Sequence, residues 1–350
     1  MLKPSFGLAV QVLRGLSSLA SRERGEGCIA TVGVFDGVHL GHFHVLQKVR
    51  ELAAAREFPS AVVTFAGHPK ATLLGRGPSA ITSLEHRLLL FRRSGMALAL
   101  VLDFDAALRE LSAEAFLHQV LLDGLGMKEL VLGFDSKFGK DRRGTVETLA
   151  PLARELDFGL HQISALRLEG RAISSTAIRE AVSLGELDRA AAMLGRPVSL
   201  LGTVIRGDQR GRLLGFPTAN LDLHQELQPP KGVYAALVHF PKCNGDLDAA
   251  NPLHPAVVNI GHRPTFEKQE ISVEAHLLDF EGDLYDQDME VFFLDFLRGE
   301  QRFGGPAALV AQIQEDVALA RQLLASAKDH WQIPGRYLPI EGPGPDSLSV

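Results

Sequence analysis

Two histidines stand three residues apart where a strand-like run gives way to a helical pattern. The apolar run that begins at Ile29 turns at Asp36-Gly37, and His39 and His42 follow at the start of the helical pattern. Residues three apart share one face of a helix. A helix N-terminus offers free N–H groups and a positive dipole to a phosphate. Two imidazoles placed there suit charge stabilisation on a pentavalent phosphate, so the junction predicts phosphoryl or nucleotidyl transfer.

Further polar residues follow other predicted strands. His68 and Asp135 each come directly after an apolar run, and Ser174 to Thr176 begin a helical pattern with Arg179 one turn further on. Ligands of doubly wound sheets bind at the carboxyl ends of the strands, so these residues are expected at one edge. The hydroxyls could be helix caps alone. Together with Arg179 they could equally hold a triphosphate.

A glycine- and arginine-rich string forms a second constellation between Gly202 and Asn220. Glycines permit positive φ and a close approach of the backbone to a phosphate. Thr218 and Asn220 offer neutral oxygens on one side of an extended strand, which suits Mg²⁺ shared with ATP. The alternative, a basic loop that touches RNA, lacks a series of stacking aromatic residues. Glu274 lies in a later alternating strand, where a solvent-facing carboxylate is the ordinary expectation.

These residues need elements to position them. Strand-like runs are expected near 28–34, 60–65, 96–102, 128–133 and 160–164, and helices near 41–57, 83–94, 112–124, 144–157 and 174–193. Such alternation predicts an α/β domain with a doubly wound parallel sheet. From about 200 to 300, short strands divided by turns predict a small antiparallel β-barrel, with an enlarged hairpin loop at 241–255. Pro306 then opens a closing helix that is expected to reach about His330.

Composition limits the function classes. The 350 residues carry a net charge of −6 and are 46% hydrophobic, which excludes wholesale disorder and fits two domains. This charge gives no global attraction to nucleic acid or to an acidic membrane. Two cysteines favour a reducing, cytoplasmic setting. No apolar run reaches the roughly 18–20 residues of a membrane span.

The motifs resemble those of bacterial bifunctional riboflavin kinase/FAD synthetases. His39-Leu-Gly-His42 is similar to the H-x-G-H signature of nucleotidylyltransferases, and the strings around His68, Asp135 and 173–179 resemble the FMN adenylyltransferase half. The string that ends at Pro217-Thr-Ala-Asn220 and those at 230–234, 259–266 and 273–280 resemble the riboflavin kinase half, a small six-stranded barrel. Together the two resemblances cover about residues 25–330.

The resemblance implies two reactions. ATP would phosphorylate riboflavin to FMN, and a second ATP would adenylylate FMN to FAD with release of pyrophosphate, both with Mg²⁺. Residues 1–185 would form the FMN adenylyltransferase domain, 186–340 the riboflavin kinase domain, and 341–350 a disordered tail. The partners would be small molecules, without nucleic acid or membrane, in a monomer or weak homo-oligomer.

The resemblance also assigns individual residues. His39, His42 and Glu274 would be catalytic, with Glu274 as the general base for the 5′-hydroxyl of riboflavin. The ATP site of the adenylyltransferase would comprise Gly33, Phe35, Asp36, Gly41, Ser174, Ser175, Thr176 and Arg179, with His68 and Asp135 at the flavin or nucleotide. The kinase would bind ATP and flavin through Gly207, Gly211, Arg212, Gly215, Pro217, Gly232, Tyr234, Asn259 and Arg298, and Mg²⁺ through Thr218 and Asn220.

Four positions depart from the family pattern. Val34 replaces the usual Asn, Gly67 the usual Pro, and Ser136 a common aromatic residue; these changes bear on flavin affinity more than on the reaction. Asp286 replaces a glycine, and Asp tolerates left-handed turn geometry.

Several alternatives stay open on the residues alone. A weakened adenylyltransferase domain could act on FMN or on another phosphorylated acceptor beside a working kinase. Decayed domains could serve as a flavin-sensing binding protein. A zinc site at His39, His42 and His44 has no cysteine or carboxylate at ligand spacing nearby.

Overall fold

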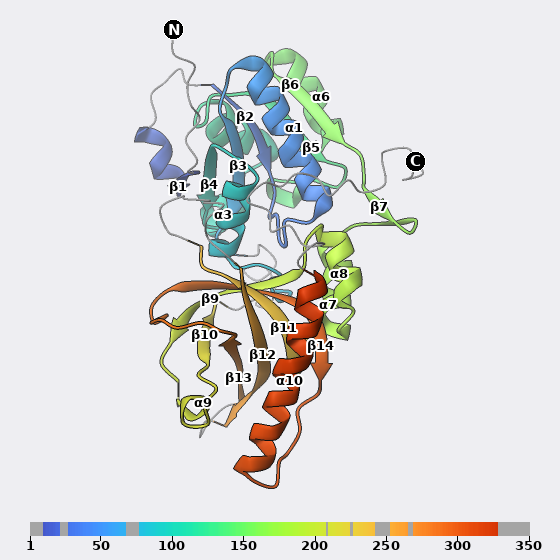
Figure 1. The fold of residues 1–350 in the computed structure, drawn as a ribbon. Coiled ribbons are helices and arrows are strands. Elements are labelled where there is room, and N and C mark those ends of the chain that lie inside the picture. The colour runs from blue at the N-terminus through green and yellow to red at the C-terminus, as the bar shows by residue number, and fades with distance from the viewer. Residues whose placement is uncertain are drawn as a thin grey trace. The chain divides into compact units, whose positions relative to one another are not determined.

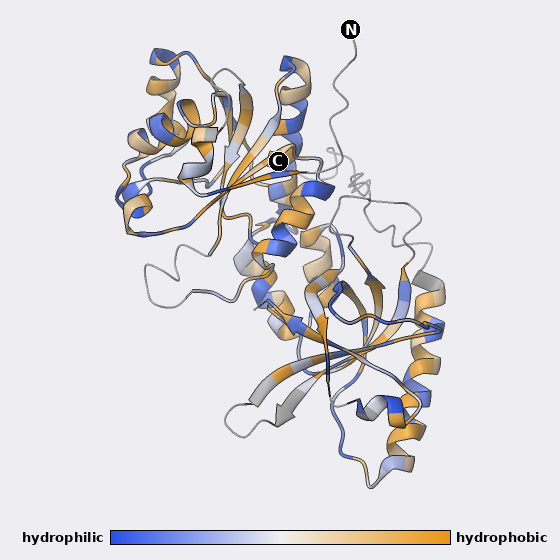
Figure 2. Ribbon diagram, turned by 90° about the vertical axis from the view of Figure 1, so that its left-hand side faces the viewer, coloured by the Kyte–Doolittle hydropathy of each residue, from blue (hydrophilic) through white to orange (hydrophobic). Residues whose placement is uncertain are grey.

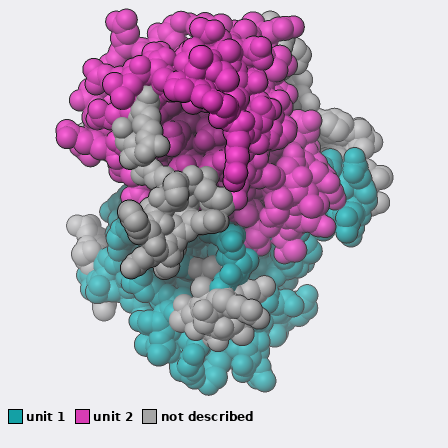
Figure 3. Space-filling view, turned by 90° about the horizontal axis from the view of Figure 1, so that it is seen from below, with its two compact units in different colours: residues 1–80, 84–175, 336–350 teal, residues 81–83, 176–335 magenta. Residues whose placement is uncertain are grey.

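The computed structural model describes residues 10–21, 27–67, 77–207, 209–224, 227–241, 253–264 and 269–327. The chain forms two compact units, which Figure 3 shows in different colours. The first comprises 1–80, 84–175 and 336–350, and the second comprises 81–83 and 176–335. The main division therefore falls between Ser175 and Thr176, ten residues before the expected domain boundary.

The first unit is built on a six-stranded sheet in which all neighbouring strands are parallel (Figure 1). Its strands are β1 (Gln11–Arg14), β2 (Cys28–Val32), β3 (Ser60–Phe65), β4 (Leu98–Leu102), β5 (Met127–Gly133) and β6 (Gly159–Ile163), in the spatial order β1-β4-β3-β2-β5-β6. The five expected strands are thus confirmed. Sequence reasoning missed β1, a short edge strand whose side chains are largely exposed.

Helices cover both faces of this sheet. They are η1 (Leu16–Ser21), α1 (Leu40–Arg56), α3 (Leu84–Arg93), α4 (Ala106–Glu110), α5 (Ala113–Phe116), a π-helical segment η2 (Leu117–Leu122), η3 (Lys140–Arg142) and α6 (Val146–Glu155). Apolar residues of α1 and α3 pack on one face, and those of α5, η2 and α6 pack on the other. The central strands are correspondingly buried along their whole length and mostly hydrophobic (Figure 2), as expected for strands covered on both faces.

The strand order reverses between β2 and β5. From β2 the chain proceeds outward through β3 and β4, whereas β5 and β6 extend the sheet on the other side of β2. In doubly wound sheets the ligand crevice lies at such a reversal, beyond the carboxyl ends of the strands. The two predicted site segments that follow β2 and β5 therefore begin at adjacent strand ends.

The second unit is a closed barrel, which confirms the predicted fold class (Figure 1). Its antiparallel strands are β9 (Val198–Ile205), β10 (Ala219–Leu223), β11 (Gly232–His239), β12 (His254–Pro264), β13 (Gln269–Leu277) and β14 (Asp288–Arg298), and its helices are α7 (Ser175–Leu184), α8 (Leu187–Leu194), α9 (Arg210–Leu213) and α10 (Pro306–Ala327). Helix α10 begins at Pro306 as predicted and packs outside the barrel on β11, β12 and β14. A small hairpin, β7 (Arg167–Leu168) with β8 (Arg171–Ala172), belongs to the first unit.

Two expected helices are interrupted. The one expected over 174–193 is two helices, because Gly185 adopts a φ of 78° between α7 and α8. The one expected over 112–124 starts as α5 and continues as η2. The predicted residue His68, most of the expected hairpin loop (242–252) and the expected tail (341–350) lie outside the described residues. Within the described part of the chain, no helix has the length and apolarity needed to span a membrane.

A buried carboxylate ties three elements of the sheet together away from the strand ends discussed above. Glu129 of β5 accepts from Arg56 Nε at 2.8 Å and lies 2.6 Å from His161 Nε2 of β6. Burial alone would raise the pKa of Glu129, but the hydrogen bonds from His161 and Arg56 outweigh it, and the net pKa lies below 4.5. A depressed folded pKa stabilises the fold above the unfolded pKa, and that stabilisation disappears as the pH falls through the folded value.

We therefore expect Glu129→Gln to lower the free energy of unfolding of the first unit by about 1–3 kcal/mol at pH 7, the range for a hydrogen bond to a charged group. The loss should shrink as the pH falls from the ordinary pKa of a glutamate toward the lower pKa of folded Glu129, because the stabilisation by a depressed carboxylate pKa disappears over that range. Urea titrations at several pH values, followed by hydrogen exchange in β5 and β6, measure it. Glu110→Gln, which removes an exposed ion pair with Lys140, is the control. An equal loss at every pH would contradict the account.

Candidate active sites

His39 caps the helix at whose start it stands. It is the residue before α1, and its Nδ1 accepts a hydrogen bond from the backbone N–H of His42 at 3.3 Å. A nitrogen that accepts carries no proton, so in the neutral ring Nε2 carries the proton and remains a donor. The His39 and His42 rings stack with centroids 3.6 Å apart. Two imidazoles and a helix N-terminus thus share one small region.

The turn that leads into this helix is strained. Phe35, Gly37 and Val38 have φ values of 54°, 83° and 36°, a region that a β-branched residue such as Val rarely adopts. Burial of the Phe35 and Val38 side chains in the core offsets the cost. The Phe35 ring packs edge-on against His42 and Phe91, so it supports the His42 imidazole from the core. Strained backbone of this kind concentrates at functional sites.

Two glycines make room for these rings. A Cβ at Gly41 would lie 3.2–3.3 Å from the His39 imidazole, and one at Gly33 would lie 3.0 Å from the Phe35 ring. Ser175 donates its hydroxyl to the Asp36 carbonyl at 3.0 Å, which ties the turn to the segment that follows the hairpin.

The remaining predicted residues of the first constellation are divided between the two units. Asp135 follows β5, adjacent to β2, and its side chain is exposed. Ser174 and Ser175, the first residue of α7, belong to the first unit, whereas Thr176 and Arg179, further along α7, belong to the second. Thus the structure brings His39, His42, Phe35, Asp36 and Ser175 together in one unit.

In the second unit, barrel register aligns three polar residues across adjacent strands. Glu274 of β13 lies opposite Asn220 of β10 on one side and opposite Asn259 of β12 on the other. Directly opposed residues share a face of the sheet. Asn259 in turn opposes Val233, which packs in the cluster beneath α10, so this polar row lies on the outer face of the barrel. Glu274 is half-buried there, not a freely solvated strand residue.

The glycine-rich string packs against this row. A Cβ at Gly207 would overlap the side-chain amide of Asn220, which is only 7% exposed. Gly211 passes so close to the Phe216 carbonyl that a Cβ would overlap it, and Phe216 N–H donates to the Gly211 carbonyl at 2.8 Å. The string therefore folds as a compact loop that places Thr218 just before β10.

His276 holds the same loop from the neighbouring strand. Its Nδ1 lies 2.8 Å from the Pro217 carbonyl, which can only accept, so Nδ1 donates. His276 lies two residues beyond Glu274 in β13 and hence on the same outer face. Sequence reasoning missed it, although its spacing from Glu274 could have indicated it.

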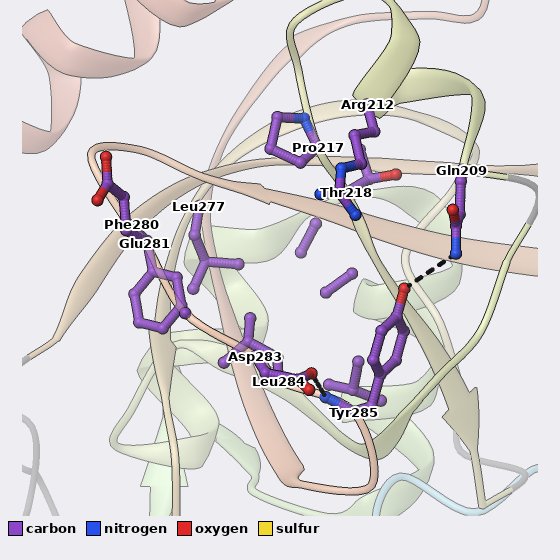
Figure 4. Close-up of a pocket in the computed structure, with 14 residues that line it drawn as sticks. Gln209, Arg212, Pro217, Thr218, Leu277, Phe280, Glu281, Asp283, Leu284 and Tyr285 are labelled. Carbon is purple, nitrogen blue, oxygen red and sulfur yellow. Dashed lines mark hydrogen bonds between the residues drawn. The ribbon is translucent and has the colours of Figure 1, made fainter.

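A pocket of about 590 Å³ opens at the mouth of the barrel (Figure 4). Inner-face residues such as Ala219 and Ala275 line it, together with the predicted residues Arg212, Pro217 and Thr218. Its far wall is the segment 280–285, where Tyr285 receives a hydrogen bond from Gln209 at 3.4 Å (Figure 4). Gln209, Phe280 and Tyr285 were not predicted. The pocket and Glu274 lie on opposite faces of β10 and β13, and Thr218 reaches the pocket at its rim.

Other predicted kinase residues serve packing in this structure. Arg298 forms a two-pronged ion pair with Asp316 of α10, with the shortest contact at 2.7 Å. Tyr234 points into the barrel, where burial raises its pKa to about 12 and its hydroxyl donates to the Pro230 carbonyl. Gly232 lies against the Phe296 ring, while Gly215, at a φ of 86°, has open space around it. Asp286, where the family usually has glycine, indeed adopts a left-handed φ of 62°.

Comparison with known proteins decides the family. A family model described as FAD synthetase matches residues 21–177, and one described as riboflavin kinase matches residues 194–324. A bifunctional riboflavin kinase/FMN adenylyltransferase of Pseudomonas fluorescens is 39% identical over 90% of this chain and 98% of its own length. The chain belongs to the bifunctional riboflavin kinase/FMN adenylyltransferase family.

Other relatives also match nearly the full length of this chain. The enzyme of the same description from Escherichia coli K12 is 35% identical, over 91% of this chain and 99% of the relative. A solved structure titled "Crystal Structure of Macrolide-efflux Protein from Streptococcus pneumoniae" is 28% identical, with a TM-score of 0.74 over 89% of this chain and 98% of that one.

The bifunctional enzyme therefore makes FMN from riboflavin and FAD from FMN, with ATP as co-substrate of both steps. A match to both halves in one chain favours this reading over a kinase joined to a weakened or redirected adenylyltransferase domain.

The packing of Gly207 on Asn220 allows a test of whether the position of the Asn220 amide matters for riboflavin phosphorylation. We expect Gly207→Ala to displace the Asn220 amide and to lower riboflavin phosphorylation by roughly tenfold or more, since small misplacements near a reacting group can cost about 10²-fold. FAD formation from supplied FMN should be unchanged. Initial rates of the two half-reactions measure both effects.

Gly304→Ala is the matched control, because a Cβ there meets nothing within 4 Å and φ is ordinary. Full kinase activity in Gly207→Ala would show that the Asn220 position does not matter.

Proposed function

We propose that the turn and helix start between Gly33 and His42 hold the ATP that adenylylates FMN. The stacked pair of His39 and His42 at a helix N-terminus carries this assignment, supported by the positive end of the helix dipole there. Gly33, Phe35, Asp36 and Gly41 shape the turn. Ser174, Ser175, Thr176 and Arg179 hold the nucleotide from the segment after the hairpin, and His68 and Asp135 complete the flavin or nucleotide side.

In this proposal a phosphate oxygen of FMN attacks the α-phosphorus of ATP, the bond to the β-phosphate breaks, and pyrophosphate leaves. A phosphate monoester is largely ionised at neutral pH, so the attacking oxygen needs no general base. His39 donates through Nε2, and His42 donates beside it, to oxygens that gain charge in the transition state.

We expect His42→Ala to lower FAD formation from FMN by roughly 10²-fold or more, the scale for losing one such donor. Riboflavin phosphorylation should stay near the wild-type rate, because the kinase residues belong to the other unit. Initial rates with purified protein check both.

His44→Ala is the control, since His44 is exposed and two residues further along α1. A His42→Ala enzyme that makes FAD at the wild-type rate would rule out the assignment.

For the kinase reaction, we propose that Glu274 is the general base. It accepts the proton of the riboflavin 5′-hydroxyl as that oxygen attacks the γ-phosphorus of ATP, and ADP leaves. The half-buried position of Glu274 between Asn220 and Asn259 supports this role. Arg212, Pro217 and Thr218 of the glycine-rich loop, which packs against the polar row, are the proposed ATP-binding residues. Gly207, Gly211 and Gly215 let this loop close beside ATP. Gly232, Tyr234, Asn259 and Arg298 are further proposed contacts to ATP or flavin.

Thr218 and Asn220 fit a Mg²⁺ ion that ATP brings. Both offer neutral oxygens, and Mg²⁺ bound to nucleotides takes one or two protein ligands and several phosphate or water oxygens. The described residues hold no cluster of three or more His, Cys, Asp or Glu that would form a dedicated metal cage. When bound, Mg²⁺ would neutralise charge on the ATP phosphates, while Thr218 and Asn220 would hold it near the pocket rim.

We expect Glu274→Gln to lower kcat for riboflavin phosphorylation by roughly 10²–10⁴-fold, the value of general-base catalysis. The amide keeps the shape but cannot accept the proton, so KM for riboflavin should change little. The same protein should still convert FMN to FAD.

Asp295→Asn, at an exposed strand carboxylate of the same barrel, is the control. Wild-type kinase turnover in Glu274→Gln would reduce Glu274 to a structural residue, whereas loss of both activities would point to misfolding.

We propose residues 1–185 and 186–340 as the two domains, with 341–350 as a tail. The stretch 178–193, which the two family models leave unmatched between them, supports this boundary, whereas the contacts within the structure divide the chain at Ser175 and Thr176. We also propose a cytoplasmic monomer or weak homo-oligomer that acts on small molecules without nucleic acid or membrane. A net charge of −6 and two cysteines support this setting.

A further inference from the structure

Arg87 of α3 is a buried arginine that neither the motifs nor the proposed chemistry includes. It is 4% exposed. Its Nη1 donates to the Val34 carbonyl at 2.7 Å and to Thr64 Oγ1 at 3.1 Å. Its Nη2 donates to the Phe65 and Ala66 carbonyls at 3.0 and 3.3 Å. One guanidinium therefore contacts the chain just beyond the end of β2 and around the end of β3.

These acceptors lie where the hydrogen bonding between β2 and β3 ends, although β3 still pairs with β4 as far as Phe65 and Leu102. The β2–β3 ladder pairs residues only up to Val32 and Val63, and Gly33 N–H still donates to the Val63 carbonyl. Beyond that point, a buried carbonyl needs another donor. Arg87 supplies it to both segments at once, and Thr64 adds a second donor to the Val34 carbonyl at 3.1 Å.

Both segments lead into the proposed adenylyl-transfer site. Val34 directly precedes the strained turn over 35–38 that presents His39 and His42. Strained backbone persists only when its surroundings over-determine it. Ser175 holds the far side of this turn through the Asp36 carbonyl, and Arg87 holds its near side.

We infer that Arg87 is a positioning residue for FMN adenylylation: its guanidinium fixes the turn after β2 relative to the segment after β3. The inference rests on the proposed role of His39 and His42. Arginine suits this task because its planar fork presents several donors in fixed directions, whereas the lysine ammonium is a compact group on a flexible stem. Transfer of a nucleotidyl group depends on such placement, because positioning and charge stabilisation carry most of the catalysis.

The test compares Arg87→Lys and Arg87→Met with wild type in the full chain. We expect kcat for FMN adenylylation to fall roughly tenfold in Arg87→Lys and roughly 10²-fold in Arg87→Met, as about 1 Å of misplacement can cost. KM for ATP and FMN should change by less than about threefold, since the binding groups remain. Riboflavin phosphorylation should be unchanged.

Hydrogen exchange separates positioning from general stability. In the Arg87 variants, hydrogen exchange should accelerate over 33–39 and 64–67 while β4 and β5 stay protected. The catalytic rates are expressed per folded molecule. Arg93→Lys, at a buried arginine six residues further along α3, is the matched control and should leave kcat unchanged. His42→Ala is measured in parallel, so failure of the proposed site and failure of the Arg87 inference remain distinguishable.

The outcomes are decisive. Wild-type kcat in Arg87→Lys, or unchanged kcat per folded molecule in Arg87→Met, would overturn the inference if His42→Ala is impaired. If Arg87→Met unfolds the first unit, the folded Arg87→Lys variant decides the question. A reduced kcat together with accelerated hydrogen exchange over 33–39 and 64–67 supports a positioning role, and a wild-type kcat rejects it. A normal His42→Ala enzyme would instead remove the site on which the inference rests.

Discussion

Hydrogen bonding between strands is the constraint on which both reactive regions depend. In the barrel, the register of β10, β13 and β12 sets Asn220, Glu274 and Asn259 side by side on one face. Because side chains alternate along a strand, a slip of one residue would turn Glu274 into the barrel interior. The apolar residues between them, such as Ala275 and Val258, make that slip costly, since they would lose their buried places. The core therefore enforces the position of the proposed base.

In the parallel sheet, the important region is the place where the hydrogen bonding between β2 and β3 ends. Strands β2 and β3 end at a shared edge, and the chain beyond them must satisfy its polar groups by other means. Arg87 and Thr64 donate to one carbonyl, Ser175 donates to another, and the His39 ring accepts the backbone N–H of His42 in the first turn of α1. Buried Phe35 and Val38 anchor the strained turn from below. The edge is thus held by side chains, which allows its backbone to adopt a shape that a strand could not.

The two reactions make different demands, and the two units differ accordingly. Riboflavin presents a hydroxyl that must lose a proton as it attacks, and the barrel places a half-buried carboxylate beside the glycine-rich loop. FMN presents an ionised phosphate, and the first unit offers donors and a helix N-terminus instead of a base. Both transfers can then proceed through positioning and charge stabilisation without a covalent enzyme intermediate.

The amino-acid sequence by itself determined the fold class of both units, because periodicity and apolar runs are local properties. It also indicated the family, because long motifs such as the one from Gly33 to His42 survive in order. Several features depended on contacts between residues that are distant in the chain, and local sequence patterns do not predict such contacts. Arg298 is held by Asp316, Tyr234 points inward, and Gly41 makes room for the His39 imidazole. Edge strand β1 and the donors of Arg87 likewise became visible only in the tertiary structure, because strand pairing and the satisfaction of buried carbonyls are decided by three-dimensional packing.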